Sequence, residues 1–264
     1  MSKPRGKSLR ITPFRALVID LMTFSQRVPI VTADRRMNLS RLVAARKACD
    51  PRPTWSALIT KAYGMVGARE PLLRRCFMSF PWPRFYENPK NIATLNIARR
   101  VGDENIVLHA HIRSPENRPL MEIDAIVHYF METPVEQIDS YRCVKRVSYL
   151  PGVLRRRLMW AALNLFGRRR CHNFGTFGLT SVAGQGAGLL NLVPLLTTTL
   201  HHGLFDDKDR LDMRLAFDHR VLDGAVAASA LAQLESTLLG EILAEVRVLA
   251  TQAGRGASGG RRAA

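Results

Sequence analysis

The sequence predicts one α/β domain of the α+β two-layer kind, with helices packed on a single mixed sheet. Short β-branched stretches alternate irregularly with longer segments whose apolar residues recur every three or four positions. The chain has 264 residues, of which 47% are hydrophobic and 23% charged, a composition typical of a folded protein. That length is sufficient for one large core, and no internal repeat divides it.

The first third of the domain is predicted to contain three helices and one strand. Prolines separate these segments, and Asn38 or Ser40 and then Thr54 are expected to cap the second and third helices. The segments are a helix over 14–24, a strand over 30–36, a helix over 39–48 and a helix from 54 to about 68.

The remaining elements follow from changes in the hydrophobic period. The polar turn at 102–105 joins two strands, and Pro134 interrupts a long helical stretch. An apolar helix lies between two arginine triplets, and a glycine-rich stretch follows the next strand. In order, the segments are strands at 92–101 and 106–112, helical residues 120–144, a helix at 150–170, strands at 175–182, 195–202 and 211–217, and a helix at 225–249.

The charge is unevenly distributed along the chain. The formal net charge is +17, and 15 of these excess charges lie in three stretches without any acidic residue: 1–10, 143–170 and 251–264. The remaining body is nearly neutral, which argues against a protein whose whole surface binds nucleic acid. We expect a flexible basic arm at 1–10, a catalytic or binding domain at 11–250 and a disordered tail at 251–264.

Several classes of protein are excluded or disfavoured. The four cysteines are far apart and form no CxxC pair, so a zinc cluster or a disulfide framework is not expected, and a reduced, cytoplasmic setting fits. The basic N-terminus has no signal-peptide apolar stretch behind it, and no run of about 18 uncharged apolar residues predicts a membrane-spanning helix.

The segment 211–224, LDMRLAFDHRVLDG, contains the clearest candidate for chemistry. A strand delivers His219 to its end, Asp223 follows four residues later, and Gly224 precedes a helix. A histidine held at a strand end can exchange protons near neutral pH. The bare pattern also fits a histidine in a turn followed by an aspartate cap.

In its context this segment resembles the C-terminal signature of the 2-oxoacid dehydrogenase acyltransferase catalytic domain, a family that includes the dihydrolipoamide acyltransferases. That family shares its fold and its His-x-x-x-Asp-Gly motif with chloramphenicol acetyltransferase. GTFGLTSVAGQGAG at 175–188 resembles the family's Gly-Thr-Phe strand and turn, and RALVIDLMTFSQRVP at 15–29 resembles its opening helix. The resemblance implies a chloramphenicol-acetyltransferase-like mixed sheet with flanking helices.

The resemblance also implies an acyl transfer between coenzyme A and a dihydrolipoamide-like thiol, or a small hydroxyl or amine acceptor. His219 matches the general base that deprotonates the thiol, which is a weak nucleophile until ionised. Thr180 stands at the family's serine position, whose hydroxyl stabilises the tetrahedral oxyanion, with Ser181 as the second candidate. Threonine keeps the hydroxyl but adds a methyl group.

Supporting roles and partners are implied in the same way. Asp223 matches the motif aspartate, which in the chloramphenicol enzymes pairs with an arginine of the opening segment; Arg15 is the matching residue and Arg27 the other candidate. Gly224 allows close backbone approach. Members form homotrimers or assemblies of trimers with sites between subunits. We expect no lipoyl domain before the first helix, so the protein would be either a free-standing acyltransferase with another acceptor or one that uses a lipoyl group supplied in trans by a lipoyl-domain protein.

Other interpretations remain beside this one. The same fold could serve as a weakly active or inactive trimeric scaffold, while nucleic-acid binding rests on charge alone. His109 and His111 share one side of a strand, but without a third ligand no metal is expected, and the glycines after Ser181 do not form a dinucleotide-binding motif. The 150–170 segment fits a peripheral membrane contact, an oligomer contact or a core helix with solvated ends.

Overall fold

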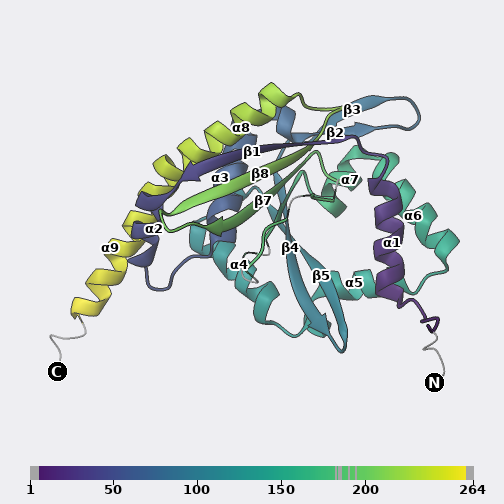
Figure 1. Cartoon of the computed structure of the whole chain (residues 1–264), viewed down its shortest axis with the longest axis horizontal. Coiled ribbons are helices and arrows are strands. Elements are labelled where there is room, and N and C mark those ends of the chain that lie inside the picture. Colours follow the sequence, from purple (N-terminus) through teal and green to yellow (C-terminus); the bar gives the residue numbers. More distant parts are fainter. Residues whose placement is uncertain (1–5, 182, 184–185, 190, 194, 260–264) are drawn as a thin grey trace, which may run out of the picture.

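A mixed six-stranded sheet forms the centre of the computed structural model, with strand order β1-β8-β7-β6-β4-β5 (Figure 1). Strand β6 pairs in parallel with β4 and β7, and all the other pairs in this sheet are antiparallel. The strands are β1 Ile30–Asn38, β4 Ile92–Val101, β5 Glu104–Arg113, β6 Phe177–Thr180, β7 Thr198–Phe205 and β8 Arg210–Asp218. The structure describes residues 6–181, 183, 186–189, 191–193 and 195–259, with side chains up to 252.

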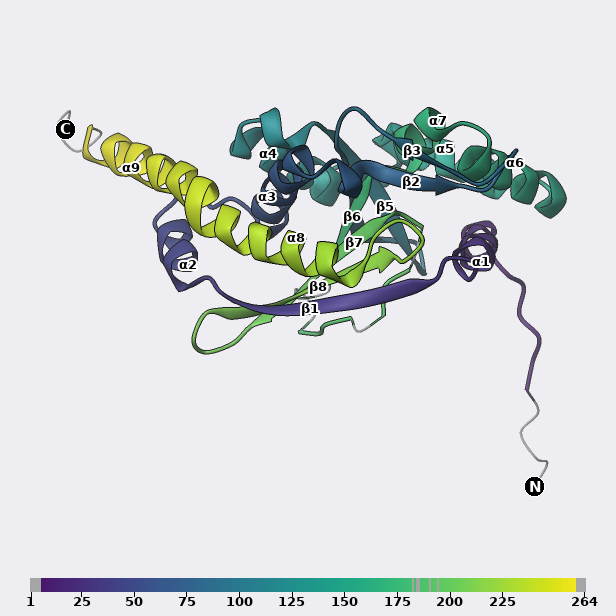
Figure 2. The same cartoon turned by 90° about the horizontal axis from the view of Figure 1, so that it is seen from above.

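Helices α3, α4, α8 and α9 lie together on one side of the sheet (Figure 2). The helices are α1 Pro13–Ser25, α2 Ser40–Lys47, α3 Trp55–Arg69, α4 Leu120–Glu132, α5 Asp139–Ser148, α6 Gly152–Asn164, α7 Gly167–Phe174, α8 Gly224–Thr237 and α9 Leu243–Gly259. A π-helical turn, Leu238–Ile242, connects α8 to α9. Most of the predicted helices and strands are therefore confirmed, including Thr54 as the N-cap of α3, whose side chain accepts a hydrogen bond from the Ala57 N–H.

The sheet has an apolar face and a polar face. On every strand, a residue that points to one face is followed by a residue that points to the other. One cross-strand row is apolar and faces the helices: Ala33, Leu95, Ala110, Leu179, Leu200 and Leu215. The next row faces the opposite side, which we call the open face: Asp34, Asn96, His109, Thr180, His201 and Arg214. The period-2 alternation of strands therefore places Thr180 on the open face.

The predicted helix at 150–170 is interrupted, and two close approaches explain where its parts end. A Cβ at Gly167 would lie 2.1 Å from the Tyr86 ring, so α7 starts at a residue that only glycine allows. Gly175, with φ +92° and Thr94 Oγ1 2.2 Å from a Cβ position, ends α7 before β6. The closely packed backbone around 164–175 thus produces α6 and α7 in place of one helix.

Two further differences concern segments that the sequence pattern did not indicate. The residues β2 Arg75–Met78 and β3 Arg84–Glu87 form a two-stranded hairpin. Prolines between the two strands interrupt the sequence pattern that would predict them. Helix α9 continues to Gly259, within the segment 251–264, and residues 260–264 lie outside the described part. Residues 6–12 of the predicted arm have no helix or strand and are exposed; residues 1–5 lie outside the described part.

The stretch Gly224–Gln252 is, among the described residues, the one helical stretch long and apolar enough to cross a membrane by length and composition alone. Its apolar residues are used in this fold, since Ala227, Leu231, Leu234 and Ile242 are buried in the main core. We therefore interpret it as a core helix.

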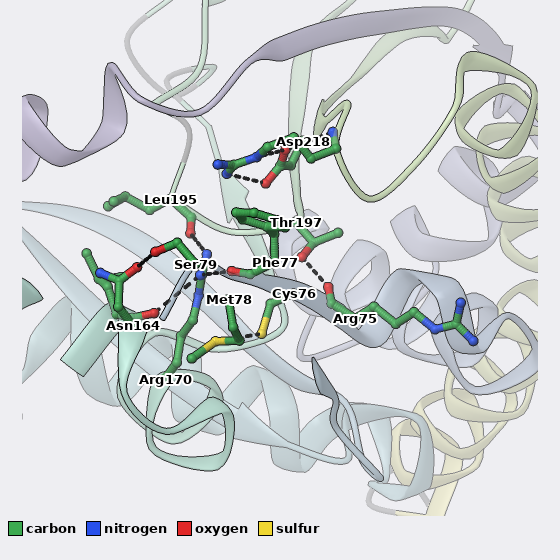
Figure 3. Close-up of polar contacts among 12 residues, drawn as sticks. Arg75, Cys76, Phe77, Met78, Ser79, Asn164, Arg170, Leu195, Thr197 and Asp218 are labelled. Carbon is green, nitrogen blue, oxygen red and sulfur yellow. Dashed lines mark hydrogen bonds and ion pairs between the residues drawn. The ribbon is translucent and has the colours of Figure 1, made fainter. Parts of the chain in front are cut away.

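The two arginine triplets are divided between the interior and the surface. Arg155 is buried and its Nε lies 2.5 Å from Asp20 Oδ2, which ties α6 to α1. Arg170 is also buried and donates to the carbonyl oxygens of Phe77 at 2.6 Å and Leu195 at 3.1 Å (Figure 3). These two cations have structural roles, so they are not available as a site for the anionic groups of coenzyme A.

The Arg155–Asp20 pair gives a direct test of this packing. Replacing Arg155 with methionine is expected to lower the free energy of unfolding by about 3 kcal/mol, because the buried Asp20 carboxylate would lose its closest partner and retain only the more distant Arg156. Urea unfolding measures this change. The matched control is Arg156→Met, since Arg156 is half-exposed and lies 3.5 Å from Asp20; a loss as large as that of Arg155→Met would contradict the assignment.

Candidate active site

His219 lies in the turn directly after β8, with its side chain 47% exposed. Its N–H donates to the Pro29 carbonyl oxygen at 3.0 Å, so the residue before β1 fixes the backbone of the turn. The imidazole packs edge-on against Phe217, with 5.7 Å between ring centroids. Its Nδ1 lies 3.7 Å from Asp223 Oδ1, and Nε2 has no hydrogen-bond partner among the described residues.

The residues on each side of His219 hold the turn in place. Asp218 is buried, and its two carboxylate oxygens accept from Arg220 Nε at 2.9 Å and Nη2 at 2.7 Å. The Arg220 guanidinium lies 4.4 Å over the Phe77 ring of the hairpin, and the Asp218 N–H donates to the Thr197 carbonyl at 3.0 Å. Figure 3 shows Asp218 beside Thr197 and Phe77. These positioning residues were not predicted from the sequence, although Asp218 and Arg220 flank the histidine.

Asp223 and Gly224 stand at the start of α8, as predicted, and the pairing of Asp223 with an arginine of the opening segment stays a prediction. Asp223 is the N-cap, its side chain is 83% exposed, and it makes no side-chain capping hydrogen bond. Within the described residues no ion pair joins it to Arg15 or Arg27. Arg15 lies in the first turn of α1, a helix about 20 Å long, and its opposite end leads to the Pro29 contact.

Thr180 is the last residue of β6, on the open face, and it lies in register with Asn96 and His201. Its side chain is half-buried and makes no hydrogen bond to another described residue. The neighbouring Asn96 Oδ1 accepts from His109 Nδ1 at 2.8 Å. The hydroxyl of Thr180 is thus available to a ligand on a polar surface.

His201 and Arg214 hold the chain beside Thr180. The Leu189 N–H donates to His201 Nε2 at 2.8 Å, so the proton of this ring is on Nδ1, which donates to the Thr180 carbonyl oxygen at 3.1 Å. Arg214 Nη1 donates to the Leu189 carbonyl oxygen at 2.9 Å, and its Nε lies 3.3 Å from Asp34. Burial lowers the pKa of His201, in agreement with a neutral ring. The sequence analysis gave His201 no partner.

Ser181 faces the other way and is tied to the backbone. Its Oγ accepts from the Ala183 N–H at 3.2 Å and donates to the His202 carbonyl oxygen at 3.4 Å. Burial lowers the pKa of His202 to about 4, so this ring is neutral at pH 7. Of the two predicted hydroxyls, that of Thr180 is therefore the one without a hydrogen bond to the residues that the structure describes.

A single chain does not bring Thr180 and His219 together. The strand pairing places Thr180 of β6 level with His201 of β7 and Arg214 of β8. His219 follows Arg214 by five residues, just after the end of β8. At about 3.4 Å per residue this places the two some 17 Å apart along the strand direction alone. A base and an oxyanion donor must both lie about 3 Å from the reacting groups.

The His109–His111 pair lies on one side of β5, as predicted. Burial lowers the pKa of His109 to about 4, and it also lowers that of His111. Among the residues that the structure describes, no group of three or more His, Cys, Asp or Glu side chains could hold a metal ion. His109 instead donates a hydrogen bond to Asn96, its neighbour on the open face.

Solved structures share this fold. A protein described as a probable dihydrolipoamide acetyltransferase from Listeria monocytogenes matches with a TM-score of 0.63 at 17% identity, over 88% of this chain and 94% of its own. The dihydrolipoamide acetyltransferase of Azotobacter vinelandii matches at 0.61 and 17%, over 93% and 94%; its study concerns a serine, a histidine and an asparagine in the mechanism. Chloramphenicol acetyltransferase matches at 0.52 and 10%, over 83% and 94%.

These matches confirm the predicted fold. The chain has the fold of the dihydrolipoamide acyltransferase catalytic cores, which chloramphenicol acetyltransferase shares. No family model and no curated protein sequence matches it. At these low identities the correspondence concerns the fold, and the chemistry has to be argued from the residues.

Proposed function

We propose that this protein is an acyltransferase that moves an acyl group between coenzyme A and a thiol, or a small hydroxyl or amine acceptor. The fold and the pair His219–Asp223 support this proposal together. In the Azotobacter enzyme the histidine and asparagine under study are four residues apart, the spacing of His219 and Asp223 here. Thr180 would correspond to the serine, because the resemblance of 175–188 to the family's Gly-Thr-Phe strand and turn places it at the family's serine position.

The active site would form between subunits, and the separation of Thr180 from His219 carries this inference. Both groups have the chemistry the reaction needs, but five strand residues separate them within one chain. A neighbouring subunit that places its open face against the His219 turn would complete the site. We therefore propose a homotrimer, alone or within a larger assembly, as the active species.

The steps follow from general chemistry. His219 Nε2 removes the proton of the acceptor thiol, and the thiolate sulfur attacks the thioester carbonyl carbon. The carbonyl oxygen becomes an oxyanion, which accepts a hydrogen bond from Thr180 of a neighbouring subunit. Collapse breaks the bond to the coenzyme A sulfur, which takes the proton from His219. Asp223 stabilises the imidazolium in between, and the products are the acylated acceptor and free coenzyme A.

A screen of acyl-CoA donors tests this function. Release of the coenzyme A thiol is followed with dihydrolipoamide, including a lipoyl domain supplied in trans, and with small alcohols and amines. We expect saturable, acceptor-dependent release for at least one pairing. Binding of acyl-CoA without turnover with any acceptor class would instead support the inactive scaffold. The observation that motivates this alternative is the threonine at the position where the family has serine.

A further inference from the structure

Exposed apolar side chains gather at the end of the molecule formed by α6, α7 and the β2–β3 hairpin. In this surface, which we call the apolar–basic end, Trp82 is 66% and Phe166 56% exposed, more than is usual for side chains of this size. The apolar members are Phe80, Trp82, Val153, Leu154, Leu158 and Phe166. Figures 1 and 2 place α6 at one end of the molecule, next to α1 and far from α9.

The hairpin and α6 form one continuous surface. The rings of Phe80 and Trp160 meet edge to face with 5.5 Å between centroids. Ser79 Oγ donates to Asn164 Oδ1 at 2.6 Å, one turn further along the same side of α6 (Figure 3). The exposed rings of the hairpin connection therefore lie beside the outer side of α6.

Helix α6 exposes apolar residues of the kind that a surface helix normally buries. Its buried side holds Arg155, which pairs with Asp20, whereas Val153, Leu154 and Leu158 face solvent. A surface helix normally turns its apolar stripe inward. An outward apolar stripe indicates that this side contacts an apolar phase or a partner.

The charge around this stripe is of one sign. No Asp or Glu occurs from residue 140 to 205, which includes α6 and α7, and none from 71 to 86, which includes all of the hairpin except Glu87. Four arginines flank the apolar side chains and are exposed: Arg156, Arg157, Arg168 and Arg169. Exposed aromatic and aliphatic residues among arginines fit the boundary between anionic head groups and acyl chains.

We propose that the apolar–basic end docks on the surface of an anionic lipid membrane, with α6 parallel to it. A second copy of this end fits less well, because two surfaces with an excess of arginine repel one another. The charge pattern favours a polyanionic partner, and the apolar stripe favours one with an apolar layer beneath its charge. The docking would bring the protein to acyl chains, but it does not depend on the acyltransferase proposal.

Sedimentation with lipid vesicles tests the docking. The full chain is expected to co-sediment with vesicles of phosphatidylcholine and phosphatidylglycerol, to bind much less to phosphatidylcholine alone, and to be released by salt. Leu154→Glu with Leu158→Glu is expected to abolish binding. Arg157→Glu with Arg168→Glu is expected to weaken partitioning by about 30-fold or more, since each lost cation weakens it roughly fivefold.

Val248→Glu is the matched control, because Val248 is exposed on α9 and is expected to leave binding unchanged. Circular dichroism checks that each variant is folded. If the variant with both leucine substitutions does not fold, the variant with both arginine substitutions tests the proposal. Equal binding to both vesicle types, or unchanged binding of either pair variant, would overturn the proposal. A change in oligomeric mass by light scattering for Leu154→Glu/Leu158→Glu would assign the surface to a protein contact instead. Thiol-release activity is measured separately, so it distinguishes this outcome from failure of the proposed function.

Discussion

Replacing His219 with asparagine is expected to lower kcat/KM for thiol acylation by roughly 10²- to 10⁴-fold, the usual contribution of a general base. Asparagine keeps a polar side chain at the end of β8 but cannot accept the proton of a thiol. The turn should keep its conformation, because the backbone bond to Pro29 and the Asp218–Arg220 pair do not involve the imidazole. Coupled detection of released coenzyme A measures the change.

The matched control is His128→Asn, since His128 is 44% exposed on α4 and pairs with Glu132, away from the proposed site. It is expected to have parental activity. Unfolding midpoints of both variants should stay close to that of the parent. If His219→Asn retained parental activity with the best acceptor, His219 would not be the base and the proposed mechanism would be wrong.

The strand pattern made much of the central fold predictable. Strands β1, β4, β5 and β8 were evident because β-branched and apolar residues recur there with period 2, and the His219 turn follows from the end of one of them. The hairpin β2–β3 was missed because it has only four residues on each strand and two prolines between them. Short strands of this kind are defined by contacts, here by Phe77 beneath Arg220.

The open face could not be predicted, since its row comes from strands far apart in sequence. Asn96, Thr180 and Asp34 are brought level only by the register of the six strands. The arginine triplets illustrate the same limit on a helix. Each residue turns by about 100°, so Arg155 points to the buried Asp20 while Arg157 faces solvent, although the two are nearly adjacent in sequence.

The assignment of Thr180 rests on its free hydroxyl and leads to the second large expected effect. Thr180→Val keeps the shape but removes the donor, and it is expected to lower kcat by about 10²- to 10³-fold, as for the loss of an oxyanion donor. Thr180→Ser should retain activity because it keeps the hydroxyl. Ser181→Ala should retain it as well, since the Ser181 Oγ is engaged with the backbone of Ala183 and His202.

Mixing the two inactive variants should restore activity if each site takes His219 from one subunit and Thr180 from its neighbour. In trimers assembled at random from equal amounts of His219→Asn and Thr180→Val chains, about a quarter of the interfaces would combine both intact residues. The unfractionated mixture is therefore expected to reach about a quarter of parental activity. Each variant alone is expected to keep only its own low residual activity.

The experiment requires that the chains exchange, so the two variants carry different tags and are co-expressed, and mixed assemblies are isolated by both tags in succession. This isolation removes the homotrimers, and each mixed trimer has one complete interface in three, so the isolated assemblies should reach about a third of parental activity. The control is a chain with both substitutions, mixed with parental chains. This chain supplies neither an intact His219 nor an intact Thr180, so in the control only two parental neighbours can form a complete site. Activity no higher than the sum of the two variants would mean that both groups act within one chain or that Thr180 is not the donor. The first of these would require β6 and the His219 turn to approach across a distance of five strand residues, which the paired register of β6, β7 and β8 opposes.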